Sequence, residues 1–173
     1  MAIPNTVTMY PYTQIIFPDK ITFGNPVIID SFVLIYVKKH MTIGNYVHIA
    51  AFVSIAGHEE IHIGDFSGVS NGSRIFSATD DFVDWGFGNP TVPPEYRNVK
   101  SGPVIIGKFA MIGANAVILP GVTIGDGVTV GANSVVSCDL EPWGVYINNK
   151  RIRERNKQGV LATYEKFLAN SLS

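Results

Sequence analysis

Isoleucine and valine recur at every sixth residue through much of the chain. In the second half six such positions follow one another without a gap: Ile106, Ile112, Ile118, Ile124, Val130 and Val136. The residues two places earlier are mostly small or β-branched, and glycine directly follows several of the six. In an ordinary strand, apolar and polar residues alternate with period two over a few residues, and then the strand ends. A period of six held through six repeats instead predicts a solenoid, with a short strand and a corner in each repeat.

The first half follows the same period in groups of three. The groups are Phe23, Ile29 and Ile35; Ile43, Ile49 and Ile55; and Ile63, Val69 and Ile75. Between groups the spacing lengthens to eight residues, and before Ile106 it lengthens to 31. Three repeats close one triangular coil, so we expect an all-β fold of about five coils over residues 21–137, with one long loop at residues 76–102. The middle positions of the coils should stack in one column: Ile29, Ile49, Val69, Ile112 and Val130.

The longer spacings all fall at one corner of the predicted triangle. They place Lys38 to His40, Gly57 to Glu60 and the long loop along the same edge, because successive coils stack at about 4.8 Å. Insertions in a solenoid usually form its binding face. The alternative is that they are ordinary surface insertions. Since they contain His, Glu and Trp, we expect a functional site along this edge.

The repeat ends after Val136, and the composition becomes helical from Lys150. Val160, Leu161, Tyr164, Phe167 and Leu168 form one apolar stripe, which predicts a C-terminal helical tail over residues 150–171 that caps or straps the open end of the solenoid. The whole chain, 1–173, then reads as a single domain, with residues 1–20 as a leading segment.

Composition and charge narrow the class of protein. The net charge is −1, which gives no reason to expect nucleic acid or an anionic membrane as a partner. No apolar run reaches the roughly 18 residues of a membrane span. Cys138 is the single cysteine, so a disulfide framework is excluded and a cytoplasmic location is expected.

The repeats themselves resemble a known family. The stretch from Ile112 to Gly125, with Ile106-Gly107 before it and Val130 to Val136 after it, is similar to the hexapeptide-repeat acyltransferases. The nearest branch comprises galactoside, maltose, serine and xenobiotic acetyltransferases. This resemblance implies a left-handed parallel β-helix, acetyl-CoA as co-substrate, no required metal, a histidine general base, and a homotrimer with active sites between subunits. Apolar residues expected on the outside, such as Val33, Val53 and Phe109, also favour an assembly.

Four histidines are candidates for the general base. An imidazole suits this role because its usual pKa, about 6.5, lies near the working pH. His58 lies in the irregular corner beside Glu59 and Glu60, either of which could orient the ring. His40 lies at the same corner one coil earlier. His48 and His62 each precede an inward isoleucine and should point outward from flat faces. We therefore assign catalysis to His58 with Glu59 or Glu60, and treat a solvated turn histidine as the alternative.

The long loop has the residue types of a sugar site. Carboxylates and amides hydrogen-bond hydroxyl groups, and aromatic rings stack on sugar rings. The alternative is a solvated loop stiffened by prolines. The candidate acceptor-binding residues are Asp80, Asp81, Trp85, Asn89, Tyr96 and Arg97.

A basic cluster follows the last coils. Residues 150–173 have a net charge of +4 and residues 1–149 a net charge of −5. Phosphates favour clustered cations, and small residues in the last coils would let the pantetheine arm approach the backbone. The candidate CoA-binding residues are Gly113, Ala114, Ala132, Ser137, Lys150, Arg151 and Arg153.

Several functions are compatible with these patterns. The favoured one is acetyl transfer from acetyl-CoA to a sugar hydroxyl of a surface polysaccharide or sugar precursor. The alternative is N-acetylation of a nucleotide-linked amino sugar, which we rank second because such enzymes often have an additional N-terminal nucleotide-binding domain. A zinc protein resembling γ-class carbonic anhydrases and a non-catalytic scaffold are less favoured.

Overall fold

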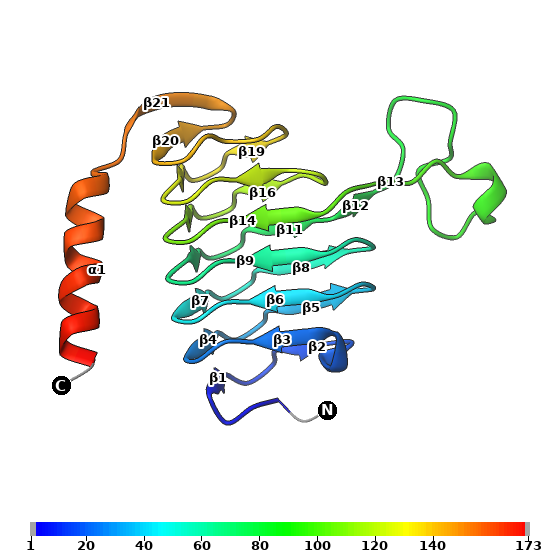
Figure 1. Ribbon diagram of the computed structural model, residues 1–173. Coiled ribbons are helices and arrows are strands. Elements are labelled where there is room, and N and C mark those ends of the chain that lie inside the picture. Colours follow the sequence, from blue (N-terminus) through cyan, green and yellow to red (C-terminus); the bar gives the residue numbers. More distant parts are fainter. Residues whose placement is uncertain (1–2, 172–173) are drawn as a thin grey trace.

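The computed structural model describes residues 3–171, so the two outermost residues at each end of the predicted domain lie outside the described part. The chain winds into a triangular solenoid with a long loop on one side and a helix on the other (Figure 1). This is the left-handed parallel β-helix that the sequence predicts.

Three parallel sheets form the sides of the prism, and we call them sheets A, B and C. Sheet A contains β1 (Val7–Met9), β4 (Val27–Ile29), β7 (Val47–Ile49), β10 (Gly68–Val69), β15 (Met111–Ile112), β18 (Thr129–Val130) and β20 (Gly144–Ile147). Sheet B contains β2 (Gln14–Ile15), β5 (Leu34–Val37), β8 (Ser54–Gly57), β11 (Arg74–Phe76), β16 (Val117–Ile118) and β19 (Val135–Val136). Sheet C contains β3 (Ile21–Phe23), β6 (Met41–Ile43), β9 (Ile61–Ile63), β14 (Val104–Ile106) and β17 (Thr123–Ile124).

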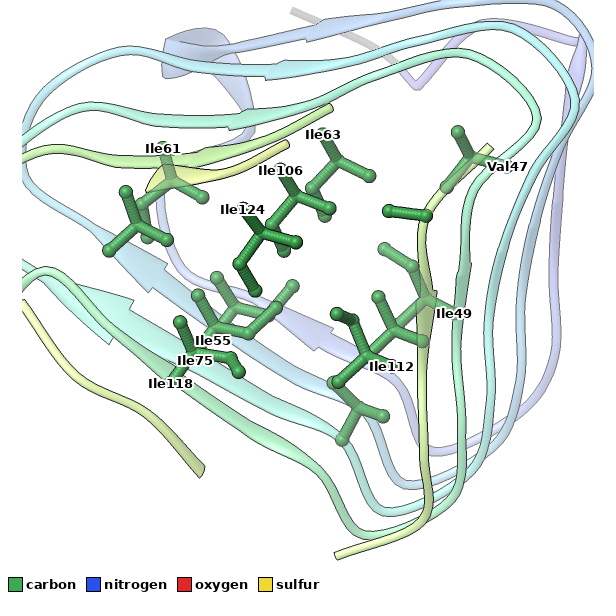
Figure 2. Close-up of a cluster of buried hydrophobic side chains, with 14 of the residues drawn as sticks. Val47, Ile49, Ile55, Ile61, Ile63, Ile75, Ile106, Ile112, Ile118 and Ile124 are labelled. Carbon is green, nitrogen blue, oxygen red and sulfur yellow. The ribbon is translucent and has the colours of Figure 1, made fainter. Parts of the chain in front are cut away.

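The register is the one predicted from the six-residue period. In sheet A, Ile29 pairs with Ile49, Ile49 with Val69, Val69 with Ile112, and Ile112 with Val130. The labelled isoleucines of all three sheets point into the prism, and those of each sheet follow one another along its axis (Figure 2). Complete burial of such a side chain typically stabilises a fold by about 1.5–3 kcal/mol. The interior columns are therefore the main source of the fold's stability.

The prediction of about five coils is too low. Sheet A has seven parallel levels, because β1 and β2 form a partial coil before the first predicted one, and Leu140 and β20 continue after the last. The prediction that Val33 and Val53 lie on the outside is also wrong. Each is 1% exposed and packs in the core. Each follows a corner residue with positive φ, which turns the chain inward there.

The corner between sheets A and B, called the AB corner, repeats one backbone conformation in every coil. The residue there has φ between 53° and 72°: Tyr12, Phe32, Phe52, Gly72, Asn115, Asn133 and Asn148. Asparagine and glycine tolerate this left-handed conformation best. The three aromatic rings stack on one another, with ring centroids 5.2 and 5.1 Å apart. We call Tyr12, Phe32 and Phe52 the aromatic ladder.

Two asparagines close the C-terminal end of sheet B. The backbone N–H of Val135 donates to Oδ1 of Asn148, and that of Ser137 donates to Oδ1 of Asn149, both at 2.9 Å. One coil lower, Val117 and Leu119 donate to backbone carbonyls of the next coil. The asparagine side chains thus replace the strand that a further coil would supply.

The predicted helical tail is shorter than expected. Residues 150–154 form strand β21 (Lys150–Glu154), which pairs antiparallel with β20, and helix α1 spans Lys157–Ser171. The helix lies along the corner between sheets C and A and not over the open end (Figure 1). Its Tyr164 and Phe167 contact the rings of Phe66 and Phe109 edge-on. Phe109, expected to face a partner subunit, is therefore covered by the chain's own helix.

Candidate active site

The insertion containing His58 lies at the corner between sheets B and C, the BC corner, as predicted. Gly57 ends β8 with φ of 154°, and a Cβ on it would lie 2.1 Å from Oγ of Ser77. The Ser77 hydroxyl donates to the Glu59 carbonyl at 2.9 Å and accepts from the Glu59 N–H at 3.1 Å. Glycine at 57 and serine at 77 therefore hold the insertion against the first residues of the long loop.

His58 faces a cleft of about 250 Å³ between sheet B and the long loop. The cleft is also lined by Tyr36 and Phe76 from sheet B and by Asp80 and Arg97 from the loop. Nη2 of Arg97 donates to Oδ1 of Asp80 at 2.8 Å. The Nε of Arg97 is the one buried side-chain nitrogen or oxygen within residues 3–171 that has no hydrogen-bond partner. The site thus combines an imidazole, a carboxylate and a guanidinium with an unused donor.

The electrostatic surroundings keep His58 neutral. Partial burial lowers the pKa of the imidazole, and the positive charges of Lys38 and Arg97 lower it further. The negative charges of Asp80 and Glu59 oppose this effect but do not reverse it. At pH 7 the His58 ring is therefore unprotonated and able to accept a proton.

The two carboxylates next to His58 have other surroundings. Glu59 forms an ion pair with Lys39 at 2.6 Å. Glu60 is exposed and lines a separate cavity of about 320 Å³ with His40 and His62. In the part of the chain that the structure describes, neither carboxylate is hydrogen-bonded to His58.

The other histidines are outside the His58 cleft. Nε2 of His40 lies 3.1 Å from Oγ1 of Thr22. His48 and His62 are exposed on the outer faces of sheets A and C, as predicted. Nε2 of His48 lies 3.0 Å from Oδ2 of Asp30, which makes an ion pair when the ring is protonated.

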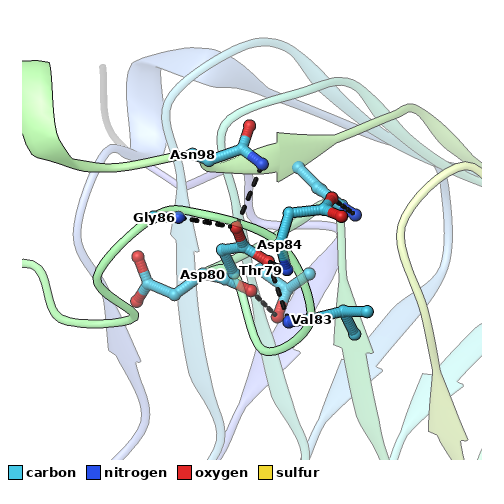
Figure 3. A network of polar contacts seen from close by, with 8 residues as sticks. Thr79, Asp80, Val83, Asp84, Gly86 and Asn98 are labelled. Atoms are coloured by element: carbon cyan, nitrogen blue, oxygen red, sulfur yellow. Dashed lines mark hydrogen bonds and ion pairs between the residues drawn. The ribbon is translucent and has the colours of Figure 1, made fainter.

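The long loop leaves the solenoid through β12 (Ala78–Thr79) and β13 (Lys100–Ser101), which pair antiparallel. Asp81 is 5% exposed and organises the loop. Figure 3 shows this network of polar contacts, with Val83, Asp84, Gly86 and Asn98 labelled. Its carboxylate accepts hydrogen bonds from the backbone N–H groups of Val83, Asp84 and Gly86 and from the side chain of Asn98. These donors hold the pKa of Asp81 far below its usual range. Asp81 is therefore committed to loop structure, while Asp80 faces the cleft.

Three other predicted acceptor residues lie apart from His58 within one chain. Trp85 and Tyr96 are 67% and 55% exposed, and Oδ1 of Asn89 accepts hydrogen bonds from Thr91. Tyr36 and Phe76, which do line the cleft, were not among the predicted residues. Each directly follows an inward isoleucine next to the irregular corner, so the period itself contained the signal.

The predicted CoA residues flank the upper end of sheet B. Gly113 and Ala114 precede β16, and Ala132 precedes β19. Ser137 follows β19, and its Oγ accepts a hydrogen bond from Nδ2 of Asn149 at 2.8 Å. The adjacent Lys150 begins β21, so the fold brings Ser137 and the basic segment together.

The two arginines of that segment differ in their partners. Arg151 forms an ion pair with Glu154 at 2.6 Å, and Arg153, opposite Val145 in the hairpin, is exposed. Arg155 is structural, because its Nη1 donates to the carbonyls of Phe109 and Gly127. Lys150 and Arg153 are therefore the cations with no ion pair in the described hairpin.

Comparison with known proteins identifies the family of this chain. The family described as "Bacterial transferase hexapeptide (six repeats)" matches residues 103–138. A dTDP-4-amino-4,6-dideoxy-D-glucose acyltransferase of Escherichia coli is 37% identical over 143 residues, which cover 81% of this chain and 74% of the relative. WbbJ of Escherichia coli (strain K12), described as "Putative lipopolysaccharide biosynthesis O-acetyl transferase", is 33% identical over 89 residues, covering 46% of this chain and 45% of WbbJ.

Solved structures agree. AntD, an N-acyltransferase from Bacillus cereus in complex with dTDP and 3-hydroxybutyryl-CoA, matches with a TM-score of 0.85 and 36% identity over 98% of this chain and 87% of AntD. An AntD variant in complex with dTDP-4-amino-4,6-dideoxyglucose and coenzyme A matches with a TM-score of 0.88 and 34% identity over 95% of this chain and 90% of AntD.

The chain belongs to the hexapeptide-repeat acyltransferases. It is a CoA-dependent acyltransferase, with acyl-CoA as co-substrate. Within residues 3–171 no helix is both long and apolar enough to span a bilayer. The same residues contain no group of three His, Cys, Asp or Glu side chains that could hold a metal ion.

Proposed function

We propose that this enzyme transfers an acyl group from CoA to the amino group of a dTDP-linked 4-amino-4,6-dideoxy sugar. The likeness to the Escherichia coli enzyme and to AntD supports this N-acylation more strongly than the sugar hydroxyl that the sequence favoured. An additional nucleotide-binding domain is not required for this likeness, because AntD in complex with dTDP is matched over 87% of its own length.

One observation supports the chemistry most directly, the neutral imidazole of His58 in a cleft beside Asp80. An amine attacks a thioester only through its lone pair, and it must lose a proton as the C–N bond forms. The lowered pKa of His58 makes it a proton acceptor at neutral pH. Asp80 lies on the loop side of the same cleft, where its negative charge would attract an amino group.

The reaction would then proceed in two stages. The amine attacks the thioester carbonyl, the C–N bond forms, and the proton passes from nitrogen to an imidazole nitrogen of His58. The tetrahedral oxyanion collapses, the C–S bond breaks, and the thiolate takes the proton from the imidazolium to leave as free CoA. Arg97 holds Asp80 at the cleft through its Nη2.

For CoA we propose the upper end of sheet B. Gly113 allows the coils to stack, because a Cβ on it would be 2.6 Å from the Ala132 nitrogen of the next coil. Ala114 and Ala132 have only a methyl group as side chain. Such a surface lets the pantetheine arm lie near the backbone. Lys150 and Arg153 would bind its phosphates.

We also propose a homotrimer with active sites between subunits. The exposed Trp85 and Tyr96 lie on a loop that projects away from its own solenoid (Figure 1). Large exposed aromatics of this kind usually contact a partner. In a trimer these loop residues could reach an acceptor bound by a neighbour.

The test measures free thiol released from acetyl-CoA with two acceptors. One is dTDP-4-amino-4,6-dideoxyglucose, and the other is the matched sugar nucleotide with a hydroxyl at C4. We expect turnover with the amine, little with the hydroxyl, and loss of the amine reaction in His58→Ala. Turnover with the hydroxyl alone would refute N-acylation and favour O-acetylation, for which the likeness to WbbJ is the supporting observation.

A further inference from the structure

The formal charges are unevenly distributed over the solenoid. We call the outer faces of sheets A and B, with the AB corner between them, the AB surface; it comprises residues 7–16, 27–37, 47–57, 68–76, 111–119, 129–137 and 145–149. Asp30 and Arg74 are its two formally charged residues. The shorter remainder of the solenoid contains many more: Asp19, Lys20, Lys38, Lys39, Glu59, Glu60, Asp65, Lys108, Asp126, Asp139 and Glu141.

The AB surface also exposes large apolar side chains near its lower corner. The aromatic ladder is 76%, 51% and 59% exposed at Tyr12, Phe32 and Phe52, and Ile28 and Leu34 on either side are 40% and 37% exposed. Depletion of charge together with exposed aromatics is the composition of the core of a protein interface. A patch of this kind on a soluble protein marks a contact surface.

The geometry of the AB surface indicates which molecule contacts it. The ladder rings repeat once per coil, so they form a straight edge parallel to the solenoid axis. Identical edges can meet around a rotation axis parallel to that edge, which closes the assembly with every ladder buried. In such an assembly sheet A of each copy faces sheet B of the next. The occupant that fits is a second copy of this chain.

The His58 cleft is incomplete in a single chain. Its volume of about 250 Å³ is below the roughly 300–1,000 Å³ of pockets that enclose even drug-sized ligands. Acyl-CoA and a sugar nucleotide together are far larger. The cleft opens at the outer side of sheet B, where a facing sheet A would supply a second wall.

One polar group on sheet A lies at the right height to complete the site. Asp30 and His48 form their contact in a depression of about 470 Å³, which Tyr10 also lines. His48 lies in β7, and His58 follows β8 of the same coil. Rotation about an axis parallel to the solenoid does not change height, so His48 of one copy lies level with His58 of the next.

We infer that the AB surface is the contact between copies, with the aromatic ladder at the threefold axis, and that the Asp30–His48 pair of one copy faces the His58 cleft of its neighbour. This inference rests on the proposed trimer. The carboxylate and imidazole can bind hydroxyl or amino groups of the acceptor from the side opposite His58. His48 is then a positioning residue supplied by the partner copy.

The assembly is tested by sedimentation velocity of Phe52→Asp and Phe52→Asn. Both residues tolerate positive φ, and both remove the ring, but only aspartate buries a charge. We expect Phe52→Asn to remain trimeric and Phe52→Asp to sediment as a monomer with an unchanged circular dichroism spectrum. If Phe52→Asp proves unfolded, Leu34→Glu tests the same contact without a special backbone conformation. Trimers in the folded aspartate or glutamate variant would overturn the inference.

The shared site is tested by mixing subunits. His58→Ala and His48→Ala are each assayed at low acceptor concentration, and then as co-expressed mixed trimers. A shared site is intact only when the copy that supplies His58 is the His48→Ala variant and the next copy is the His58→Ala variant. In a closed ring with random mixing in equal amounts, about a quarter of the sites meet this condition. Activity no higher than the mean of the two parent enzymes would overturn the shared site. Because sedimentation needs no substrate, trimers that form through this surface but do not acylate the amino sugar would refute only the proposed function.

Discussion

The solenoid interior and the long loop are held in place by opposite means. In the interior, columns of isoleucine and valine exclude water, and the same contact repeats in every coil. The loop has no such column: Phe82, Val83, Trp85 and Phe87 are all exposed, and one buried carboxylate, Asp81, holds the turn through backbone donors. His58 lies where the two regions meet.

This difference predicts how stability and function are divided between the regions. Hydrophobic columns have many equivalent members, so each contributes a part of the total stability. The loop has fewer contacts, and the Asp81 carboxylate accepts four of its hydrogen bonds. We therefore expect substitutions in the interior to change global stability, and substitutions in or beside the loop to change activity.

The largest expected effect is at the junction. Removing a general base typically lowers the rate by about 10²- to 10⁴-fold, so His58→Ala should lower kcat by that order while the unfolding midpoint stays near wild type. Stopped assays of free CoA and a thermal melt measure the two quantities. His40→Ala, which changes a histidine outside the cleft, is the matched control. More than about a tenth of the activity in His58→Ala would disprove the assignment.

The next effect belongs to the interior. Ile112→Ala removes a fully buried side chain from the sheet A column and should lower the free energy of unfolding by about 2–5 kcal/mol. Ile105→Ala, at a 41% exposed position of sheet C outside the AB surface, is the control and should change it by less than about 0.5 kcal/mol. Urea unfolding measures both. Equal losses in the two variants would contradict the inward column.

Asp81→Asn tests the loop. An amide cannot accept the same hydrogen bonds as strongly as a carboxylate, so limited proteolysis between residues 82 and 98 should accelerate while the urea midpoint of the solenoid changes little. Asp84→Asn, whose ion pair with Lys100 is half exposed, should have a smaller effect. A large drop in the urea midpoint would mean that the loop and the solenoid unfold together.

Acidification provides the same test without a mutation. The pKa of Asp81 is lower in the folded loop than in an unfolded chain. Its stabilising contribution is therefore complete above the unfolded value of about 3.9 and is lost as the pH falls through the folded pKa. Hydrogen exchange of the Val83, Asp84 and Gly86 amides should stay slow at pH 5 relative to intrinsic rates and become faster only in stronger acid.

The smallest effect concerns the pH profile. Lys38 contributes to the lowered pKa of His58, after burial. Lys38→Met should therefore raise this pKa and move the rising limb of kcat/KM to higher pH. Lys108→Met, at a different corner, should leave the limb in place. An unchanged limb in Lys38→Met would show that another group controls the profile.

The sequence predicted the interior well because each inward position repeats a local rule. The extra coils were missed although Met9 and Ile15 are also six apart and precede Phe23 by the same step of eight. At the other end Leu140 and Tyr146 are six apart, but the step before Leu140 shortens to four. The ends of a repeat lack neighbours, so their pattern is less regular.

The site was predictable only in part. His58 is a candidate because it interrupts the period, and the structure places Asp80 and Arg97 in the same cleft. Nothing in the sequence distinguishes Asp80 from Asp81, because their different surroundings arise from contacts with Gly86, Arg97 and Asn98, more than four residues away. The ion pair of Glu59 with Lys39 likewise joins two coils. Such contacts depend on the register between coils and on the path of the loop.

The asparagine closure of sheet B also affects how molecules meet end to end. A parallel solenoid that stopped at Val136 would leave a row of unpaired N–H groups facing along its axis, and another molecule's first coil could pair with them. Growth in that direction has no closing point and would produce a fibre. Asn148 and Asn149 occupy the donors of Val135 and Ser137, and β21 covers the edge of sheet A in the antiparallel sense. Two amide side chains and one reversed strand thereby oppose end-to-end growth at this end of the prism.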